Sequence, residues 1–166
     1  MKIIVLSDTH MPRMAKKLPS ALIPHLNEAD AIIHAGDWQT KEIAEELRQF
    51  APVYGVTGNV DEPALHNVFD KSITLTFHSL TIGVTHGDGK GKTTEQRALD
   101  QFKGEELDLL IFGHSHIPLY KEKDGLVLFN PGSPTDKRRQ EQFSFGLLEI
   151  KKKDWSIKHV YYDSKK

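Results

Sequence analysis

Seven residues of the chain carry side chains that commonly bind divalent metal ions in proteins. They are Asp8, His10, Asp37, Asn59, His86, His114 and His116. Carboxylates, an amide oxygen and imidazoles together suit Mn²⁺, Fe²⁺, Zn²⁺ and related ions. Seven ligands are too many for one tetrahedral site, but they suit two ions that share a bridging carboxylate. Two ions about 3.5–4 Å apart lower the pKa of a water between them and hold both oxygens of an in-line displacement at phosphorus, so the set favours hydrolysis of phosphate esters.

Each of these residues follows a short apolar run that we interpret as a β-strand. The runs cover residues 2–7, 31–35, 53–57, 80–85 and 109–112, and they are rich in Ile, Val and Leu. Continuous apolar runs of this length are typical of strands covered on both faces. In open α/β sheets, ligands bind beyond the carboxyl ends of the strands, so five strand ends can bring the seven side chains together.

Other segments complete the expected α/β fold. Further strands are expected at residues 73–77, 126–129, 144–150 and 155–162. Residues 41–50 and 94–102 place apolar side chains on one helical face, and in a third candidate helix, residues 20–29, Pro24 predicts a kink or a late start. Strand–helix alternation predicts right-handed parallel βαβ units in the N-terminal half. After Phe112 no helical pattern follows, and we expect C-terminal antiparallel strands in a meander.

Composition narrows the class of protein. The chain has 166 residues, 38% of them hydrophobic and 27% charged, which fits one globular domain over residues 1–166. It contains no cysteine, which excludes a disulfide framework, a thiolate nucleophile and a Cys-ligated metal site. A net charge of −1 argues against broad nucleic-acid binding. The apolar runs are too short for a membrane span, and no signal peptide is recognisable, so we expect a cytoplasmic protein.

Five short motifs, in order along the chain, resemble those of the calcineurin-like metallophosphoesterases. They are Asp8-Thr9-His10, Gly36-Asp37, Gly58-Asn59, His86-Gly87 and Gly113-His114-Ser115-His116. The chain length and Asn130-Pro131-Gly132-Ser133 resemble the small prokaryotic branch of YfcE-type phosphodiesterases, which is similar to the retromer subunit of the same fold. The resemblance covers essentially the whole chain. It implies a four-layer αββα sandwich, in which helices flank two sheets.

The resemblance also implies a role for each ligand. Asp8, His10 and His116 would hold a first ion, Asn59, His86 and His114 a second, and Asp37 would bridge them. The expected enzyme is a phosphodiesterase in which a hydroxide between the ions attacks phosphorus in line, with Asp37, Asn59 and His86 as catalytic residues. We expect two divalent ions per chain, Mn²⁺ ahead of Ni²⁺, Zn²⁺, Fe²⁺ or Mg²⁺, and a small phosphate ester as substrate.

Two positions depart from the family pattern. Many relatives carry a His after the motif Asn, where it helps to protonate the leaving group, but this chain has Val60. General acid catalysis typically contributes about 10²–10⁴-fold, so esters with poor leaving groups would suffer most, and a diester is favoured over a monoester. The motif His-Gly-His of relatives reads His86-Gly87-Asp88 here, which places a negative charge near the site. Val60 keeps open the alternative of a catalytically weak scaffold that binds metal or a protein partner. Homo-oligomerisation also stays open.

Several other polar residues have structural interpretations. His34 is expected to be a buried histidine with a hydrogen-bonded neighbour, and Asp61 to support the site or to cap a helix. The turn at residues 130–133 is expected to support the site through its backbone. The histidines interpreted as surface residues are His25, His66, His78 and His159.

A near-match to a phosphate-binding loop also needs an interpretation. Residues 87–93 end in Gly-Lys-Thr between a strand and a helix, but only three residues separate Gly87 from the Gly-Lys pair. A P-loop requires four, so we interpret the segment as an ordinary loop. The basic residues interpreted as solvated loop charges, with contact to substrate phosphate left open, are Arg13, Lys90, Lys92, Lys137, Arg138 and Arg139.

Overall fold

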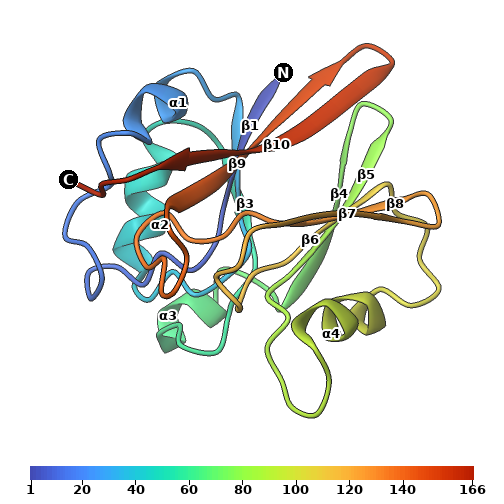
Figure 1. Ribbon diagram of the computed structural model, residues 1–166, viewed down its shortest axis with the longest axis horizontal. Helices are drawn as coiled ribbons and strands as arrows, with labels where there is room; N and C mark the ends of the chain where they lie inside the picture. The colour runs from blue at the N-terminus through green and yellow to red at the C-terminus, as the bar shows by residue number, and fades with distance from the viewer.

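Two five-stranded mixed sheets lie face to face in the computed structural model, which describes residues 1–166 (Figure 1). The first sheet has the order β10 (Asp154–Tyr162), β9 (Phe143–Lys151), β1 (Lys2–Leu6), β2 (Ala31–His34) and β3 (Val53–Gly55). The second has the order β4 (Ser72–Phe77), β5 (Leu80–Thr85), β6 (Leu109–Ile111), β8 (Leu126–Asn130) and β7 (Leu119–Lys123). The helices are α1 (Ile23–Asn27), α2 (Lys41–Arg48), α3 (Pro63–His66) and α4 (Thr94–Gln101).

Strand β1 shows how a continuous apolar run is buried on both faces. Ile3 and Val5 join the core between the two sheets, whereas Ile4 and Leu6 pack in the layer that includes α1 and α2. Strand β6 repeats the pattern, because its central residue Leu110 packs with the layer of α4 while its neighbours face the inter-sheet core. Helix, sheet, sheet and helix therefore follow one another, with α4 on the side opposite α1 and α2 (Figure 1). This confirms the expected four-layer αββα fold.

Parallel pairing brings the predicted ligand-bearing strand ends to one edge. Strands β1, β2 and β3 pair in parallel, as do β5 and β6. The corresponding edges of the two sheets meet, because the backbone N–H of His114, which follows β6, donates to the carboxylate of Asp8, which follows β1, at 3.0 Å. The loops after all five strands can therefore contribute to one site.

The C-terminal half differs from the expected meander. Strands β7 and β8 form a hairpin in the second sheet, where β8 runs parallel to β6, whereas β9 and β10 form a hairpin in the first sheet. The antiparallel pairs confirm the expected C-terminal antiparallel strands, but the meander was wrong because residues 131–142 carry the chain from one sheet to the other. Strands β8 and β9 therefore follow one another in the sequence but lie in different sheets.

The short elements show where the sequence pattern was weak. Strand β7 was not predicted, because its exposed, charged residues give no apolar run, as is common at a sheet edge. Helix α3 is a single turn of four residues and was also not predicted. Helix α1 spans only Ile23–Asn27 with Pro24 in its first turn, which confirms the expected late start. None of the four helices has the length and apolar character needed to cross a membrane.

Two histidines that were expected at the surface are half-buried. Nε2 of His159 donates to the Asn130 carbonyl at 2.7 Å, and the ring stacks on Phe129 with centroids 4.3 Å apart. Burial lowers the pKa of His159, so the ring is neutral at pH 7. His25 packs its ring edge-on against Phe145. The interpretation was wrong for both because an aromatic neighbour from a distant strand covers the ring.

Phe129 allows a test of the packing between the sheets. Its ring is fully buried in the inter-sheet core. We expect Phe129→Ala to lower the free energy of unfolding by about 3–5 kcal/mol, because it removes the buried ring and leaves a cavity. Urea denaturation followed by circular dichroism measures the change. Val68→Ala, at an exposed position, is the control and should stay within about 0.5 kcal/mol. An equally small effect at Phe129 would contradict the packing.

Candidate metal centre

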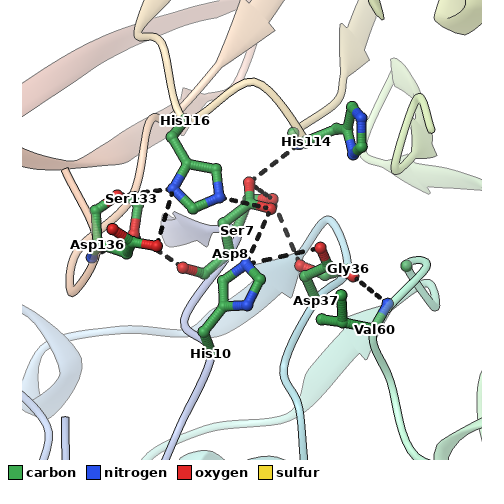
Figure 2. Close-up of polar contacts among 12 residues, drawn as sticks. Ser7, Asp8, His10, Gly36, Asp37, Val60, His114, His116, Ser133 and Asp136 are labelled. Atoms are coloured by element: carbon green, nitrogen blue, oxygen red, sulfur yellow. Dashed lines mark hydrogen bonds and ion pairs between the residues drawn. The ribbon is translucent and has the colours of Figure 1, made fainter. Parts of the chain in front are cut away.

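All seven predicted ligands lie together beyond the strand ends. Figure 2 shows Asp8, His10, Asp37, His114 and His116 around the centre of the site. Ligand atoms of Asp8, His10 and His116 lie within 4.8 Å of one another, as do those of Asp37, His86 and His114. Asn59 joins the second group, because its Oδ1 lies 3.2 Å from Nδ1 of His114. The structure brings together every residue that the sequence singles out, in two adjacent groups.

Two buried carboxylates form the centre of the site, and each is anchored through one oxygen. Oδ2 of Asp8 accepts hydrogen bonds from the Ser7 hydroxyl at 2.8 Å and from the His114 N–H at 3.0 Å. Oδ1 of Asp37 accepts one from the N–H of Val60 at 3.0 Å. The other oxygen of each carboxylate faces the imidazole rings. The anchoring therefore fixes both acids and leaves one ligand atom of each available.

Imidazole nitrogens surround these two free oxygens. The Nε2 atoms of His116, His86 and His10 lie 3.5, 3.7 and 3.8 Å from Oδ1 of Asp8. Oδ2 of Asp37 lies 3.1 Å from Nε2 of His86 and 3.6 Å from Nε2 of His10. The free oxygens of Asp8 and Asp37 thus each face rings of both groups, so both carboxylates lie between the two groups.

Hydrogen bonds on the far nitrogen fix two of the rings. Nδ1 of His86 donates to the Ala35 carbonyl at 2.8 Å, and Nδ1 of His116 donates to the Asp136 carbonyl at 2.6 Å. Because a carbonyl only accepts, Nδ1 carries a proton and Nε2 is the nitrogen presented to the site. Metal-binding histidines commonly hold their second nitrogen in this way.

Four buried atoms at the centre have no hydrogen-bond partner. They are Oδ1 of Asp8 and the Nε2 atoms of His10, His86 and His116. Each buried polar atom without a partner costs roughly 1–3 kcal/mol, so four around one point favour the binding of a polar or charged species. Ligand atoms about 2.1 Å from one ion lie roughly 3.0–3.4 Å apart, close to the separations of 3.1–3.8 Å between these nitrogens and oxygens. The donor set, its burial and its spacing fit divalent metal ions.

The backbone at most of the ligands adopts a costly conformation. The φ angle is positive at five of the seven, with values of +57° at Asp8, +43° at His10, +59° at Asp37, +70° at His114 and +62° at His116. Residues other than glycine rarely adopt this left-handed region, and such strain clusters at functional sites. Packing in the rest of the sandwich must therefore hold these loops in place.

His86 balances the charge of the two acids when no metal is bound. Burial alone would lower the pKa of His86, but the carboxylates of Asp8 and Asp37 raise it to about 9. Burial would raise the pKa values of both acids, but the neighbouring imidazoles hold them below their ordinary range. At pH 7 the metal-free site thus contains two carboxylates and a protonated His86.

Asp61 supports the site from behind. Its carboxylate accepts hydrogen bonds from the N–H groups of Asp37 at 3.0 Å, Gly58 at 2.7 Å and Gln39 at 2.8 Å. It does not cap α3, whose N-cap residue is Glu62, so support of the site is the role found. Gly58 packs so closely on Asp37 that a Cβ atom there would collide with the carboxylate. A glycine is therefore needed beside this ligand.

His34 is buried and neutral, as the sequence predicts. Its ring stacks on Trp38 with centroids 3.8 Å apart, Nδ1 accepts from the Gly36 N–H at 3.1 Å, and Nε2 donates to the Thr9 hydroxyl at 3.1 Å. Burial lowers the pKa of His34 to about 3. Since Thr9 and Gly36 each neighbour a ligand, this ring links the loops after β1 and β2.

Side chains after β8 support the site in a way that the sequence analysis missed. The Ser133 hydroxyl donates to the Asp8 carbonyl at 2.8 Å and accepts from the Asp136 N–H at 2.8 Å. Nδ2 of Asn130 donates to the Gly113 carbonyl at 3.0 Å. The sequence predicted support from the backbone of this turn, whereas side chains provide much of it. The position of Asn130 at the end of a strand was the available signal.

The loop at residues 87–93 does not form a phosphate cradle. Arg97 of α4 donates to the Gly87 carbonyl at 2.8 Å and to the Lys92 carbonyl, so its guanidinium group links the two ends of the loop. Nζ of Lys92 pairs with Asp100 at 2.6 Å. Asp88 lies near enough to His114 to raise its pKa, although burial lowers that pKa overall. The expected negative charge near the site is therefore present.

Known proteins share this sequence pattern and fold. Residues 1–153 match a family model described as the calcineurin-like phosphoesterase superfamily domain. A protein of Methanocaldococcus jannaschii named "Probable metallophosphoesterase" is 40% identical over 141 residues, covering 83% of this chain and 70% of that protein. Another protein of this organism, named a phosphodiesterase, is 25% identical over 178 residues, covering 93% and 96%. The solved structure of Vps29 from Entamoeba histolytica in complex with Zn²⁺ superimposes with a TM-score of 0.76 at 26% identity, covering 98% and 99%.

The charge state of His86 predicts how metal binding depends on pH. A metal can bind Nε2 only after its proton leaves, so Mn²⁺ binding to the metal-free protein at pH 7 should release a proton. Mn²⁺ affinity should rise with pH until about pH 9, the pKa of His86. Calorimetry in buffers of different ionisation enthalpy counts the protons. His86→Gln is the comparison and should flatten the pH dependence. Binding by the wild-type chain without proton release would contradict this charge balance.

Proposed function

The chain belongs to the calcineurin-like phosphoesterase superfamily, and on that basis we propose that it is a phosphodiesterase that depends on two divalent metal ions. The observation that carries the proposal is the set of four buried, unpartnered ligand atoms beside two anchored carboxylates. An apolar ligand would leave these atoms without partners. Ions that accept electron pairs from all four would satisfy them together.

The proposed ligand sets follow the two groups of side chains. Asp8, His10 and His116 would hold one ion, Asn59, His86 and His114 the other, and Asp37 would contact both. When bound, the ions would supply Lewis-acid charge that lowers the pKa of a water between them and stabilises negative charge on phosphoryl oxygens during in-line attack. Mn²⁺ is the proposed ion because it suits a mixed oxygen and nitrogen set, and Zn²⁺ is the alternative because it accompanies the Vps29 relative.

The proposed catalytic residues act by holding groups rigidly. The Val60 N–H fixes Asp37, and the Ala35 carbonyl fixes His86, so neither side chain has to reorganise when substrate arrives. Asn59 is exposed at the rim, and its Nδ2 has no hydrogen bond within the chain. We assign that N–H group to a phosphoryl oxygen of the substrate, while Oδ1 serves as the metal ligand.

Val60 supports the choice of a diester with a good leaving group. Its side chain is 44% exposed and follows Asn59 directly. A valine cannot donate a proton, so the leaving oxygen must depart largely as an anion. Diesters of acidic alcohols or phenols meet this requirement better than alkyl monoesters. The relative named a phosphodiesterase supports the same substrate class.

A scaffold with little catalytic activity is the second candidate. Val60 favours it, because the side chain that would have assisted the leaving group is replaced by an exposed apolar one. Such a scaffold would still bind metal through the same ligands. The two candidates therefore differ in turnover and not in metal content.

The Asp37→Asn substitution tests the proposed enzyme. With Mn²⁺ added to metal-stripped protein, the wild-type chain should hydrolyse bis(4-nitrophenyl) phosphate faster than 4-nitrophenyl phosphate. Asp37→Asn should reduce turnover by about 10²–10³-fold or more, because the shared ligand is weakened. Release of nitrophenolate measures the rate. Asp70→Asn, at an exposed carboxylate, is the matched control and should retain turnover. Metal binding without turnover would favour the scaffold.

A second substitution tests the role assigned to position 60. We expect Val60→His to accelerate hydrolysis of methyl phenyl phosphate by about tenfold or more relative to methyl 4-nitrophenyl phosphate, because only the poorer leaving group needs a proton donor. The ratio of the two rates is the measured quantity. Val60→Ala controls for the loss of the valine side chain. An unchanged ratio in Val60→His would mean that position 60 does not reach the leaving oxygen.

A further inference from the structure

A basic cavity adjoins the metal centre on the side of His116. It has a volume of about 440 Å³ and is lined by residues 115–117 on one side and 137–140 on the other. His116 belongs to both the cavity lining and the ligand set. The cavity therefore begins within one residue of the metal centre.

Two arginines in the cavity wall have almost no counter-charge. Nζ of Lys137 is already engaged, since it donates to the Glu141 carbonyl at 3.2 Å and lies 5.5 Å from the Phe143 ring centroid. Arg138 and Arg139 are exposed. The nearest pairing is Nε of Arg138 with Asp136 at 4.0 Å, and Arg139 forms no ion pair. The cavity thus presents two guanidinium groups beside one carboxylate.

Asp136 ties this cavity to the metal centre. Its carbonyl accepts the Nδ1–H of His116 at 2.6 Å, and its Oδ2 lies 3.7 Å from the same nitrogen and 4.0 Å from Nε of Arg138. Asp136 therefore both positions the metal ligand His116 and faces Arg138. The short loop that contains Asp136 and Arg138 thus joins the arginines of the cavity to the metal centre.

The backbone at Arg138 has a positive φ angle, as it does at five of the metal-ligand candidates. Its φ angle is +48°, in the left-handed region that favours glycine. Apart from the five metal-ligand candidates, the other non-glycine residues with positive φ are Gln39, whose N–H is held by Asp61, and the hairpin residues His78 and Asp124. Arg138 and Arg139 are the central residues of a turn in which the Gln140 N–H donates to the Lys137 carbonyl at 2.9 Å. This turn places both arginines in the cavity lining.

The mouth of the site is asymmetric. Val60 lies on one side, and Asp136 lies beside His116 on the other (Figure 2). Ile117, which follows His116, is 52% exposed and lines the basic cavity. One arm of a substrate would pass Asn59 and Val60, whereas the other would pass Ile117 and two arginines beside the carboxylate of Asp136. The two arms of the diester are therefore expected to differ in charge.

We propose that this cavity binds a terminal phosphate on one arm of the diester, so that the substrate class is a diester that carries a second, monoester phosphate next to an apolar or aromatic group. This rests on the proposed function. Arg138 and Arg139 bind the dianion with paired N–H groups, and Ile117 contacts the adjoining ring. Water adds to the diester phosphorus, the P–O bond to the arm without the terminal phosphate breaks, and that arm departs as an anion that takes up a proton from water. The terminal phosphate is not cleaved.

A matched pair of substrates tests the proposal. Thymidine 3′-(4-nitrophenyl phosphate) with and without a 5′-phosphate differs only in the terminal dianion, and the departing arm of both is 4-nitrophenolate. With Mn²⁺ bound, the wild-type chain should show a kcat/KM at least about tenfold higher for the 5′-phosphorylated diester, mainly through a lower KM. In Arg138→Gln/Arg139→Gln this ratio should fall to about one. Lys152→Gln/Lys153→Gln, in the turn between β9 and β10, removes the same charge elsewhere and should keep the ratio.

Binding to metal-free protein separates failure of this proposal from failure of the proposed function. Thymidine 5′-monophosphate should bind the wild-type chain at least about tenfold more tightly than thymidine, and the arginine double variant should lose that difference. If bis(4-nitrophenyl) phosphate is hydrolysed but neither the rate ratio of the two thymidine diesters nor the binding difference depends on the arginines, the cavity proposal is wrong and the phosphodiesterase stands. If no diester is hydrolysed, the binding comparison alone decides whether the cavity takes a phosphate.

Discussion

The carboxylate of Asp8 is fully buried, with one oxygen held by Ser7 and His114 and the other facing three imidazole rings. An ionised acid in such a place is stable only when positive charge stands next to it. A second carboxylate, Asp37, lies among the same rings and increases the need for positive charge at the site. The surrounding structure must therefore hold the two acids and the imidazole rings close together.

The two-sheet sandwich meets this constraint at the ends of its parallel strands. Each sheet brings ligands from its own strand ends, and the His114 N–H joins the two halves through Asp8. The ligand loops adopt left-handed backbone conformations, and they are held by hydrogen bonds that Asp61 and His34 accept and Ser133 donates. The inter-sheet core supplies the stability that allows this strain.

The sequence predicted much of the site because its signal is local. Residue type and a position just after an apolar run were enough to select the seven ligand candidates, and the apolar runs themselves predicted the doubly covered strands. The supporting side chains carry no such signal. Ser133 reaches Asp8 across 125 positions, and His159 is covered by a ring from another sheet. The C-terminal meander failed as a prediction for the same reason, because pairing between distant strands decided which sheet each hairpin joined.

Electron paramagnetic resonance of the Mn²⁺-loaded chain tests the proposal that two ions share Asp37. Two Mn²⁺ ions about 3.5–4 Å apart through a common ligand are magnetically coupled. We expect a coupled signal that reaches full intensity at two Mn²⁺ per chain and is lost in Asp37→Asn. A signal from a single isolated Mn²⁺ at saturation, unchanged by Asp37→Asn, would contradict the proposal.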